Sequence, residues 1–513
     1  MAILESLEKE NISINDLINN KKQNYIIEND CIVPDVKPDV IEIISTSGII
    51  NISKKELLDG KIRVDGNIIS FIDYKGKDEN GIVIRSINQT IEFSQIIKVD
   101  NANSDMNWEC NVQLNNIQAK IINERKINIK ADLDISINVV DIKNFEYVSN
   151  VKDVNVQKRE KTITTNSIFG IGKTKTSINE MQDPIVGDNI AEILKVNTSF
   201  KNVESKISMN KVLVKADLLV KSMYITEDNR INVIKSVYPV MGFIDMDGIG
   251  DNNVVIPYLY ITNSVFNLNN NKISLDIEIS VELSAFINKN IKIIEDMYDI
   301  EKDIKVSRKK IKTTKSVNIV YGKTNWNNSK RISIEDGNIL DVDSNILNIK
   351  NSVMTDKIKV NADLETKMII SKKGISNIKN TENIEFYIDY NGINQDSLVN
   401  LKCNIANENY NILPGGNVEL RMDIEYILEI RNIESIELIN NIEVESIEEN
   451  DSNKGEGNNN NNNKYNMIIY FTSSNDSLWE ISKKFKTTEK RIIEDNELKN
   501  NEIQPGMQLF IMR

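Results

Sequence analysis

Short segments of alternating polar and apolar residues recur three times along the chain, always in the same order. The clearest of them occupies residues 61–68 and reappears at residues 211–218 and 357–364, at intervals of 150 and 146 residues. Repetition at so regular a spacing indicates one structural unit that is used three times. Each copy of this segment is preceded by a matching lead-in, at residues 38–44, 188–194 and 343–349. Each copy is followed by a matching downstream segment, at 91–97, 237–244 and 384–388, and by a closing segment, at 126–133, 272–279 and 418–425.

The two-residue period of these segments is typical of a β-strand that has one face in a core and the other in water. Ile, Val and Thr, which favour strands, hold most of the apolar and near-apolar positions. Asp247-Gly248 and Asn391-Gly392 indicate hairpin-type turns. We therefore predict a mainly β protein, with three tandem antiparallel repeats of sandwich or barrel type followed by a small βααβ module.

The domain boundaries are predicted from changes of pattern and composition. The Asn run at residues 458–463 and its polar surroundings bury too little apolar surface to order themselves, so we expect a disordered linker there. The predicted division is an N-terminal segment 1–23, β repeats at 24–160 and 161–305, a diverged repeat at 306–445, the linker 446–465 and the module 466–513.

The composition excludes several classes of function. The chain has no histidine, which removes His-based triads, Cys-His proteases and the common His-containing zinc sites. A formal net charge of −13 argues against nucleic acid as a partner, and no window is apolar enough for a membrane span. Three cysteines and an N-terminus without a secretory signal predict buried, reduced thiols in a reducing compartment. We expect no enzymatic activity, no cofactor and no metal.

The C-terminal segment shows the pattern of a compact βααβ module. Residues 467–472 read as a strand, Ser477 and Glu480 form a capping box at a first helix, a second helix begins near Thr488, and residues 507–511 form the closing strand. At residues 475–482, Phe485, Thr488, 496–498, 503–506 and Leu509 the segment resembles the LysM family, although Asn475 and Thr472 replace the common Gly and Val.

The resemblance to LysM domains implies a groove for N-acetylglucosamine chains between two loops. Carried over to this sequence, the groove residues are Asp476, Ser477, Leu478, Asn496, Glu497, Leu498, Pro505 and Gly506. We add Trp479, because a Trp in so small a module is seldom fully buried and an exposed edge would anchor a partner. For Leu478 and Trp479 the alternative is a purely structural place in the module's core.

The combination of β repeats with a LysM tail resembles the clostridial spore-coat proteins that join SPOCS repeats to LysM. Residues 38–44 and 167–174 carry the SPOCS likeness. The resemblance implies a non-enzymatic scaffold in the mother-cell cytoplasm at the forespore surface, later in the spore coat. It also implies that the LysM module binds the stage IV A sporulation ATPase of the coat basal layer. The alternative is a structural protein of the spore wall or cortex that binds N-acetylglucosamine polymers.

Two motifs imitate functional sites. Residues 170–174 resemble the end of a phosphate-binding loop, but Ser167 stands where its first Gly belongs and the surroundings are strand-like. Residues 245–251 resemble a calcium loop, but the Gly comes too early and the final Glu is missing, so we interpret the segment as a hairpin turn. A carboxylate muramidase is the only cell-wall hydrolase that the composition leaves open.

Overall fold

The computed structural model describes residues 2–3, 7–79, 81–153, 155–330, 337–371, 374–414, 416–444, 467–498 and 502–512. Strands take 79% of the chain and helices 3%, which confirms the predicted mainly β class. Cys31, Cys110 and Cys403 are buried and free, as predicted. The predicted linker 446–465 lies outside the described residues.

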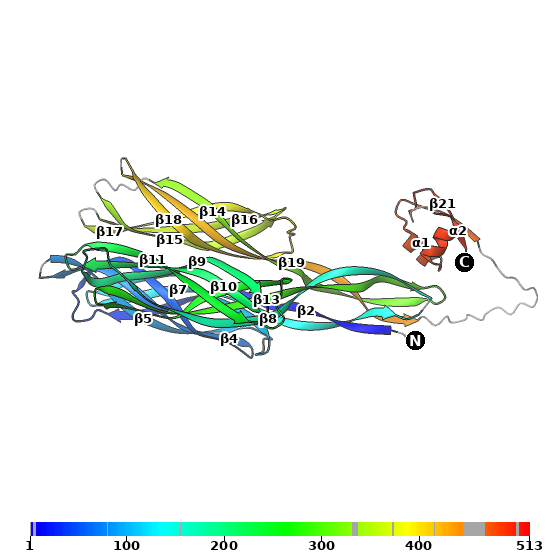
Figure 1. The fold of residues 1–513 in the computed structure, drawn as a ribbon, viewed down its shortest axis with the longest axis horizontal. Helices are drawn as coiled ribbons and strands as arrows, with labels where there is room; N and C mark the ends of the chain where they lie inside the picture. The colour runs from blue at the N-terminus through cyan, green and yellow to red at the C-terminus, as the bar shows by residue number, and fades with distance from the viewer. Residues whose placement is uncertain are drawn as a thin grey trace, which may run out of the picture.

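Three units with the same strand order make up the β-rich part of the chain (Figure 1). In each unit the first, sixth and fifth strands form one antiparallel sheet, and the second, third and fourth form another. The first unit contains β2 (Leu7–Ile32), β3 (Val40–Leu58), β4 (Lys61–Asp78), β5 (Gly81–Lys98), β6 (Asn107–Asn123) and β7 (Lys126–Val151). The second contains β8 (Val156–Gln182), β9 (Ile190–Ser208), β10 (Lys211–Thr226), β11 (Ile231–Asp245), β12 (Asn253–Asn269) and β13 (Lys272–Asp299). The third contains β14 (Ile304–Lys330), β15 (Asn338–Met354), β16 (Lys357–Ser371), β17 (Ile375–Asp389), β18 (Leu398–Leu413) and β19 (Asn417–Val444).

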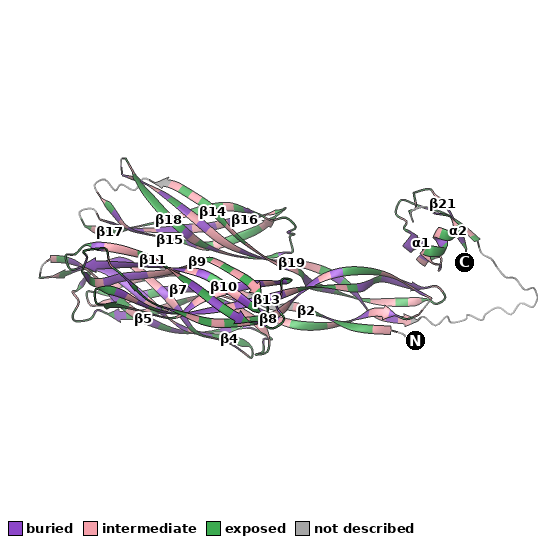
Figure 2. Cartoon of the chain, viewed as in Figure 1, coloured by how far each residue is buried: buried purple, intermediate pink, exposed green. Residues whose placement is uncertain are grey.

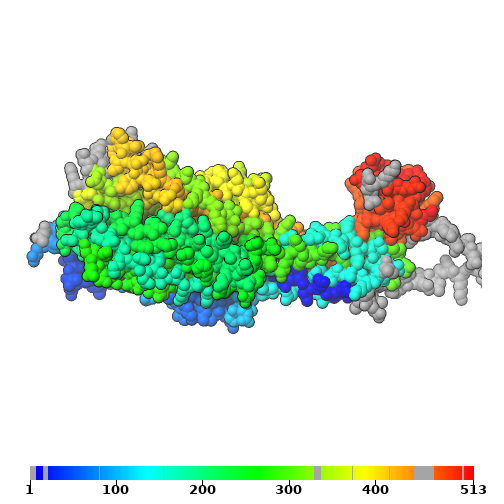
Figure 3. All heavy atoms as spheres, viewed as in Figure 1, coloured from blue at the N-terminus to red at the C-terminus, as the bar shows by residue number. Residues whose placement is uncertain are grey.

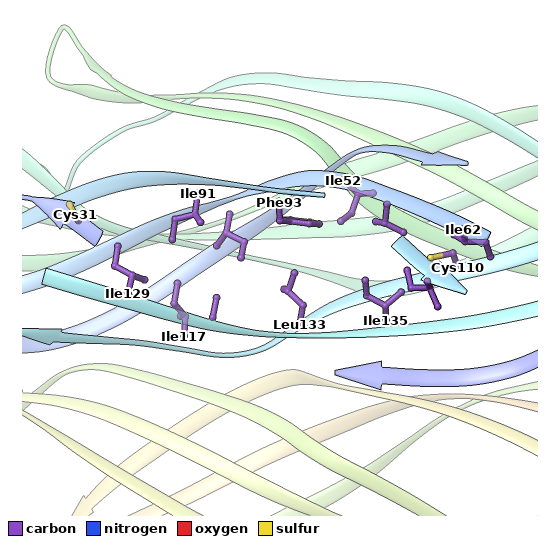
Figure 4. Packing of buried hydrophobic residues seen from close by; sticks show 14 of the residues in the cluster. Cys31, Ile52, Ile62, Ile91, Phe93, Cys110, Ile117, Ile129, Leu133 and Ile135 are labelled. Atoms are coloured by element: carbon purple, nitrogen blue, oxygen red, sulfur yellow. The ribbon is translucent and has the colours of Figure 1, made fainter. Parts of the chain in front are cut away.

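The two sheets of each unit pack face to face around an apolar core. In the first unit, Ile62 and Phe93 of one sheet and Ile129 and Leu133 of the other belong to one buried cluster (Figure 4). Over residues 126–139 of β7, burial alternates from residue to residue, as the two-residue period of the sequence predicts. Figure 2 shows buried and exposed residues interspersed along the strands of the sandwiches. The units are therefore antiparallel sandwiches, one of the two predicted types. The boundaries 24–160, 161–305 and 306–445 stay a prediction.

Three details of the sequence interpretation change. The turns at Gly248 and Gly392 join strands of different sheets, β11 to β12 and β17 to β18, so they are not hairpin turns. The lead-ins 38–44 and 188–194 begin two residues before β3 and β9, whereas the third, 343–349, lies within β15. The segment 170–174 lies inside β8 and pairs with β13, which confirms that it is no phosphate loop. Among the described residues, no group of three or more Cys, Asp or Glu is arranged to hold a metal ion.

The first and last strands of each unit are long and continue beyond the sandwiches. Their ends form three two-stranded ribbons that lie together in a projection, which we call the stalk (Figure 1). It comprises residues 7–14, 143–151, 156–165, 289–299, 304–313 and 434–444. All three ribbons contribute to its core, which includes Val148, Val156, Ile294, Met297 and Ile442. β1 (Ala2–Ile3) pairs with β19 at its end.

The sandwiches are also joined by buried ion pairs. Lys195 and Lys221 of the second unit are 4% and 6% exposed, and both pair with Asp341 and Asp343 of the third unit. The distances to Asp341 are 2.5 Å from Lys195 and 2.7 Å from Lys221. Further pairs bridge the units: Lys55 with Glu282 at 2.6 Å, Glu109 with Arg431 at 3.4 Å, and Glu192 with both Lys37 and Arg85.

The C-terminal module has the predicted βααβ order. Its elements are β20 (Met467–Phe471), α1 (Leu478–Lys484), α2 (Glu489–Asp495) and β21 (Gln508–Met512), and the two strands pair antiparallel. Neither described helix could cross a membrane, since each has seven residues. The module lies beside the stalk, away from the sandwiches (Figure 3).

Candidate binding site of the C-terminal module

The helices of the module begin where the sequence places their capping residues. The hydroxyl of Ser477 accepts a hydrogen bond from the backbone N–H of Glu480 at 3.2 Å, and that of Thr488 accepts from Arg491 at 3.1 Å. Each cap satisfies one of the amides that a helix start leaves without a partner. Both helices then pack on the two-stranded sheet through a small core of Leu478, Ile481, Ile492, Leu498, Leu509 and Ile511.

Two of the predicted groove residues hold the loops of the module in place. The carboxylate of Asp476 accepts hydrogen bonds from the Ser473 N–H, at 2.8 Å, and the Tyr470 hydroxyl, at 2.9 Å. These donors lower the pKa of Asp476. The side-chain amide of Asn496 donates to the carbonyl oxygens of Ile492 and Phe510, and its oxygen accepts from the Phe510 N–H. Both side chains therefore already have partners inside the module.

The other predicted groove residues divide by exposure. Leu478 and Leu498 are buried in the core of the module, which favours the structural interpretation of Leu478. Ser477, Glu497, Pro505 and Gly506 are exposed. The loops that carry them meet at Thr472, whose carbonyl oxygen accepts a hydrogen bond from the Gly506 N–H at 2.7 Å. This exposed rim is the part of the predicted groove that a ligand could reach.

Contrary to the prediction of an exposed edge, Trp479 is buried, because the stalk covers it. The indole is 6% exposed, and its Nε1–H donates to the carboxylate of Asp296 on β13 at 2.8 Å. Its ring stands edge to face against Tyr298, with centroids 5.1 Å apart, and the Arg159 guanidinium lies 5.4 Å from its centre. An edge-to-face pair with a hydrogen-bonded indole is a specific contact, so Trp479 fixes the module to its own chain.

Polar groups complete this contact, which we call the clasp. Lys483 Nζ lies 2.6 Å from the Asp296 carboxylate, and the Tyr298 hydroxyl donates to the Thr487 carbonyl oxygen at 2.7 Å. Burial raises the pKa of Asp296, but the hydrogen bonds from Lys483 and Trp479 outweigh it and hold the pKa below its ordinary value. The clasp consists of Asp296 and Tyr298 on the stalk, with Trp479, Ser482, Lys483 and Thr487 on the module.

A second surface of the module is apolar and uncovered. On the outer face of the β20–β21 sheet, Met467 lies opposite Met512 and Ile469 opposite Phe510. Phe471 extends the same row. These side chains are between 39% and 64% exposed. A cluster of this kind in so small a domain marks a contact surface. We call it the apolar sheet face: Met467, Ile469, Phe471, Phe510 and Met512.

The clasp and the apolar sheet face were both missed in the sequence analysis. The sheet face has a readable signal, because residues 467–471 and 509–512 are apolar at positions on both sides of the strand rather than alternating. The clasp has none, since Asp296 and Trp479 are 183 residues apart and each fits its local pattern.

Comparison with protein-family models finds the SipL SPOCS domain twice, over residues 39–122 and 189–269, and the LysM domain over residues 473–511. The SPOCS matches cover β3 to β6 of the first unit and β9 to β12 of the second. No curated protein and no solved structure matches the chain. The matches confirm the resemblance to proteins that combine SPOCS and LysM, both of which are binding domains without catalytic function.

Proposed function

We propose that this protein is a non-enzymatic scaffold of the spore coat. The chain carries two SPOCS domains and a C-terminal LysM domain, so it is a sporulation-related protein with a peptidoglycan-binding type of module. In this proposal the LysM module binds the stage IV A sporulation ATPase of the coat basal layer and tethers the coat to the forespore from the mother-cell side. The partner and the location are taken from the resemblance of the sequence.

The apolar sheet face supports a protein as the partner of the module. Protein interfaces have apolar cores, rich in Met and aromatic residues, and this face offers Met467, Phe471, Phe510 and Met512. A sugar chain is bound instead by polar groups and ring faces set in a groove. The groove that the LysM likeness implies has Asp476 and Asn496 engaged within the module, and four exposed residues remain there.

The exposed rim keeps glycan binding as the second candidate function. Ser477 and Glu497 supply polar atoms to it, and the adjacent Pro505-Gly506 turn gives it an accessible backbone. In that case the protein would be a structural component of the spore wall or cortex that binds N-acetylglucosamine polymers.

Binding by the full chain distinguishes the two functions. Ile469→Glu places a charge at the centre of the apolar sheet face, and Glu497→Ala removes a polar side chain from the rim. We expect Ile469→Glu to weaken binding of the ATPase at least about tenfold, equivalent to about 1.4 kcal/mol, and Glu497→Ala to leave it unchanged. Neither variant should unfold the module, since both side chains are exposed.

The same proteins are tested against N-acetylglucosamine oligomers. Glycan binding that Glu497→Ala weakens, without ATPase binding, would assign the protein to the spore wall. If Ile469→Glu leaves ATPase binding unchanged, the apolar sheet face is not the binding surface, and the ATPase binds another part of the chain.

A further inference from the structure

The outer face of β11 differs from the corresponding faces of the other two units. Strand pairing aligns the units, because Ala216 lies opposite Val240 where Gly66 lies opposite Phe93 and Ala362 lies opposite Ile384. On this alignment the outward positions of β11 are Val237, Pro239, Met241 and Phe243. The first unit has Thr90, Glu92, Ser94 and Ile96 at these positions, and the third has Thr381, Asn383, Glu385 and Tyr387.

Three of the four outward positions are thus polar in the first and third units and apolar in the second. The neighbouring strand repeats the contrast: Leu213, opposite Phe243, replaces Arg63 and Lys359 of the other units. Since the three units share one fold, the core does not require this change. The substitutions therefore indicate a contact that the second unit alone makes.

This row is accessible along its length. Val237, Met241 and Phe243 are 59%, 52% and 63% exposed. The intervening residues point the other way, since a Cβ on Gly242 would lie 3.1 Å from Val281 across the sandwich. The row continues the face through which Lys221 and Val233 meet the third unit, at a cavity of about 360 Å³. The third unit therefore covers one end of this face and leaves the apolar end open.

Lysines border the row. Lys206, Lys215 and Lys235 lie on the same face and are exposed, with no ion pair to any residue that the structure describes. Asp245 pairs with Lys211 at 3.0 Å, whereas Asp217 keeps its charge in its hydrogen bond from the neutral Asn202 amide at 2.7 Å, and Glu204 lies opposite Lys215. The three lysines therefore outnumber these two uncompensated carboxylates by one. In a chain of net charge −13, this basic margin selects an acidic partner.

We propose that the outer face of β10 and β11 is a docking site for an amphipathic helix of a protein partner, with an apolar stripe bordered by Asp or Glu. The four outward positions of β11 span roughly 20 Å, which matches a helix of about 13 residues. Pro239 removes a backbone N–H from this edge strand, which disfavours the addition of another strand. A second copy would bring lysine against lysine.

The test uses the full chain and two fluorescent helical peptides with the same leucine stripe, one bordered by Glu and the other by Lys. We expect the Glu peptide to bind at least tenfold more tightly than the Lys peptide and to weaken as salt is added. The double variant Val237→Thr, Met241→Ser, which carries the residues of the first unit, should weaken Glu-peptide binding at least tenfold. Tyr387→Ser, at the position in the third unit that matches Phe243, should leave it unchanged.

Three results would overturn the proposal. Equal binding of the two peptides would remove the charge argument. Unchanged binding by the double variant, with thermal unfolding like that of the unsubstituted chain, would place the peptide elsewhere. Sedimentation that shows dimers of the natural chain and monomers of the double variant would assign the face to a second copy. The substituted residues all lie outside the LysM module, so their effects on binding are independent of the function proposed above.

Discussion

Asp73 shows how a single buried group makes the fold sensitive to pH. It lies on β4 where the first unit meets β9 of the second, and it is 1% exposed. One carboxylate oxygen accepts a hydrogen bond from the Ser45 hydroxyl at 2.5 Å, and the other has no partner among the described residues. Burial deprives the ionised form of its hydration and raises the pKa of Asp73 to about 7.

This shift predicts that the fold loses stability as the pH rises. The folded-state pKa lies above the ordinary value of 3.8, so the contribution of Asp73 is complete below pH 3.8 and is lost as the pH approaches 7. Asp73→Asn should therefore raise stability at pH 8 by about 2 to 4 kcal/mol and flatten the pH dependence. Urea unfolding at pH 5 and pH 8 measures this, with the exposed Asp276→Asn as control. Parallel pH profiles of Asp73→Asn and the natural chain would contradict it.

At the scale of elements, the pairing of β4 with β5 depends on one missing side chain. Gly66 lies opposite Phe93, whereas the other units place Ala216 opposite Val240 and Ala362 opposite Ile384. A Cβ on Gly66 would lie 2.2 Å from the Asn51 carbonyl oxygen and 2.8 Å from the Phe93 ring. The larger aromatic ring thus occupies space that an alanine Cβ takes in the other two units.

We expect Gly66→Ala to destabilise the first unit by about 2 to 4 kcal/mol, since the backbone oxygen of Asn51 cannot move away as a flexible side chain could. Gly170→Ala on β8 is the matched control, because its Cβ would meet only Met246 at an ordinary 3.7 Å. Urea unfolding of both variants gives the comparison. Equal losses of stability would show that steric crowding at Gly66 is not the cause.

The clasp is an element-scale contact between α1 and β13, and Asp296 is its centre. Asp296→Ala leaves the Trp479 indole, Lys483 and Arg308 without their shared acceptor. We expect the indole to become accessible, with acrylamide quenching of its fluorescence increased severalfold. Trp108→Phe and Trp326→Phe in the background isolate this signal, and Glu437→Ala, at an exposed carboxylate elsewhere on the stalk, is the control. Unchanged quenching in Asp296→Ala would mean that other contacts suffice to hold the module.

At the scale of the whole molecule, the buried ions make the second and third units interdependent. Lys195 and Lys221 neutralise Asp341 and Asp343 inside the interface, and these lysines hold the pKa of Asp343 far below its ordinary range although burial alone would raise it. Replacing one partner leaves a buried charge uncompensated. Replacing the whole group by apolar residues removes all four of these charges together.

Lys221→Met should therefore destabilise the protein by about 3 to 5 kcal/mol. The fourfold variant Lys195→Met, Lys221→Met, Asp341→Leu, Asp343→Leu should recover most of that loss. Calorimetric unfolding of the full chain measures both. A fourfold variant less stable than Lys221→Met would show that the ion pairs contribute more than their removal from water costs.

The sequence by itself determined the parts of this protein that depend on local pattern. The two-residue period predicts the strands, since each must turn one face to a core. The interval of about 150 residues predicts three units, and Ser477, Thr488 and the apolar helix positions predict the βααβ module. The family matches bear out the SPOCS and LysM likeness that rests on such patterns.

Only the tertiary structure decided what covers each surface. Asp296 and Tyr298 lie near the end of β13, where the alternation of buried and exposed residues has already ended. Nothing in that local pattern indicates that Trp479, 183 residues after Asp296, packs over them. Likewise, Trp479 fits either a core or an exposed anchor until the stalk is placed beside it. The stalk itself arises because three long ribbons have apolar residues that none can bury alone. Periodicity reports which face of an element needs cover, and the spatial arrangement of the whole chain determines which residues supply it.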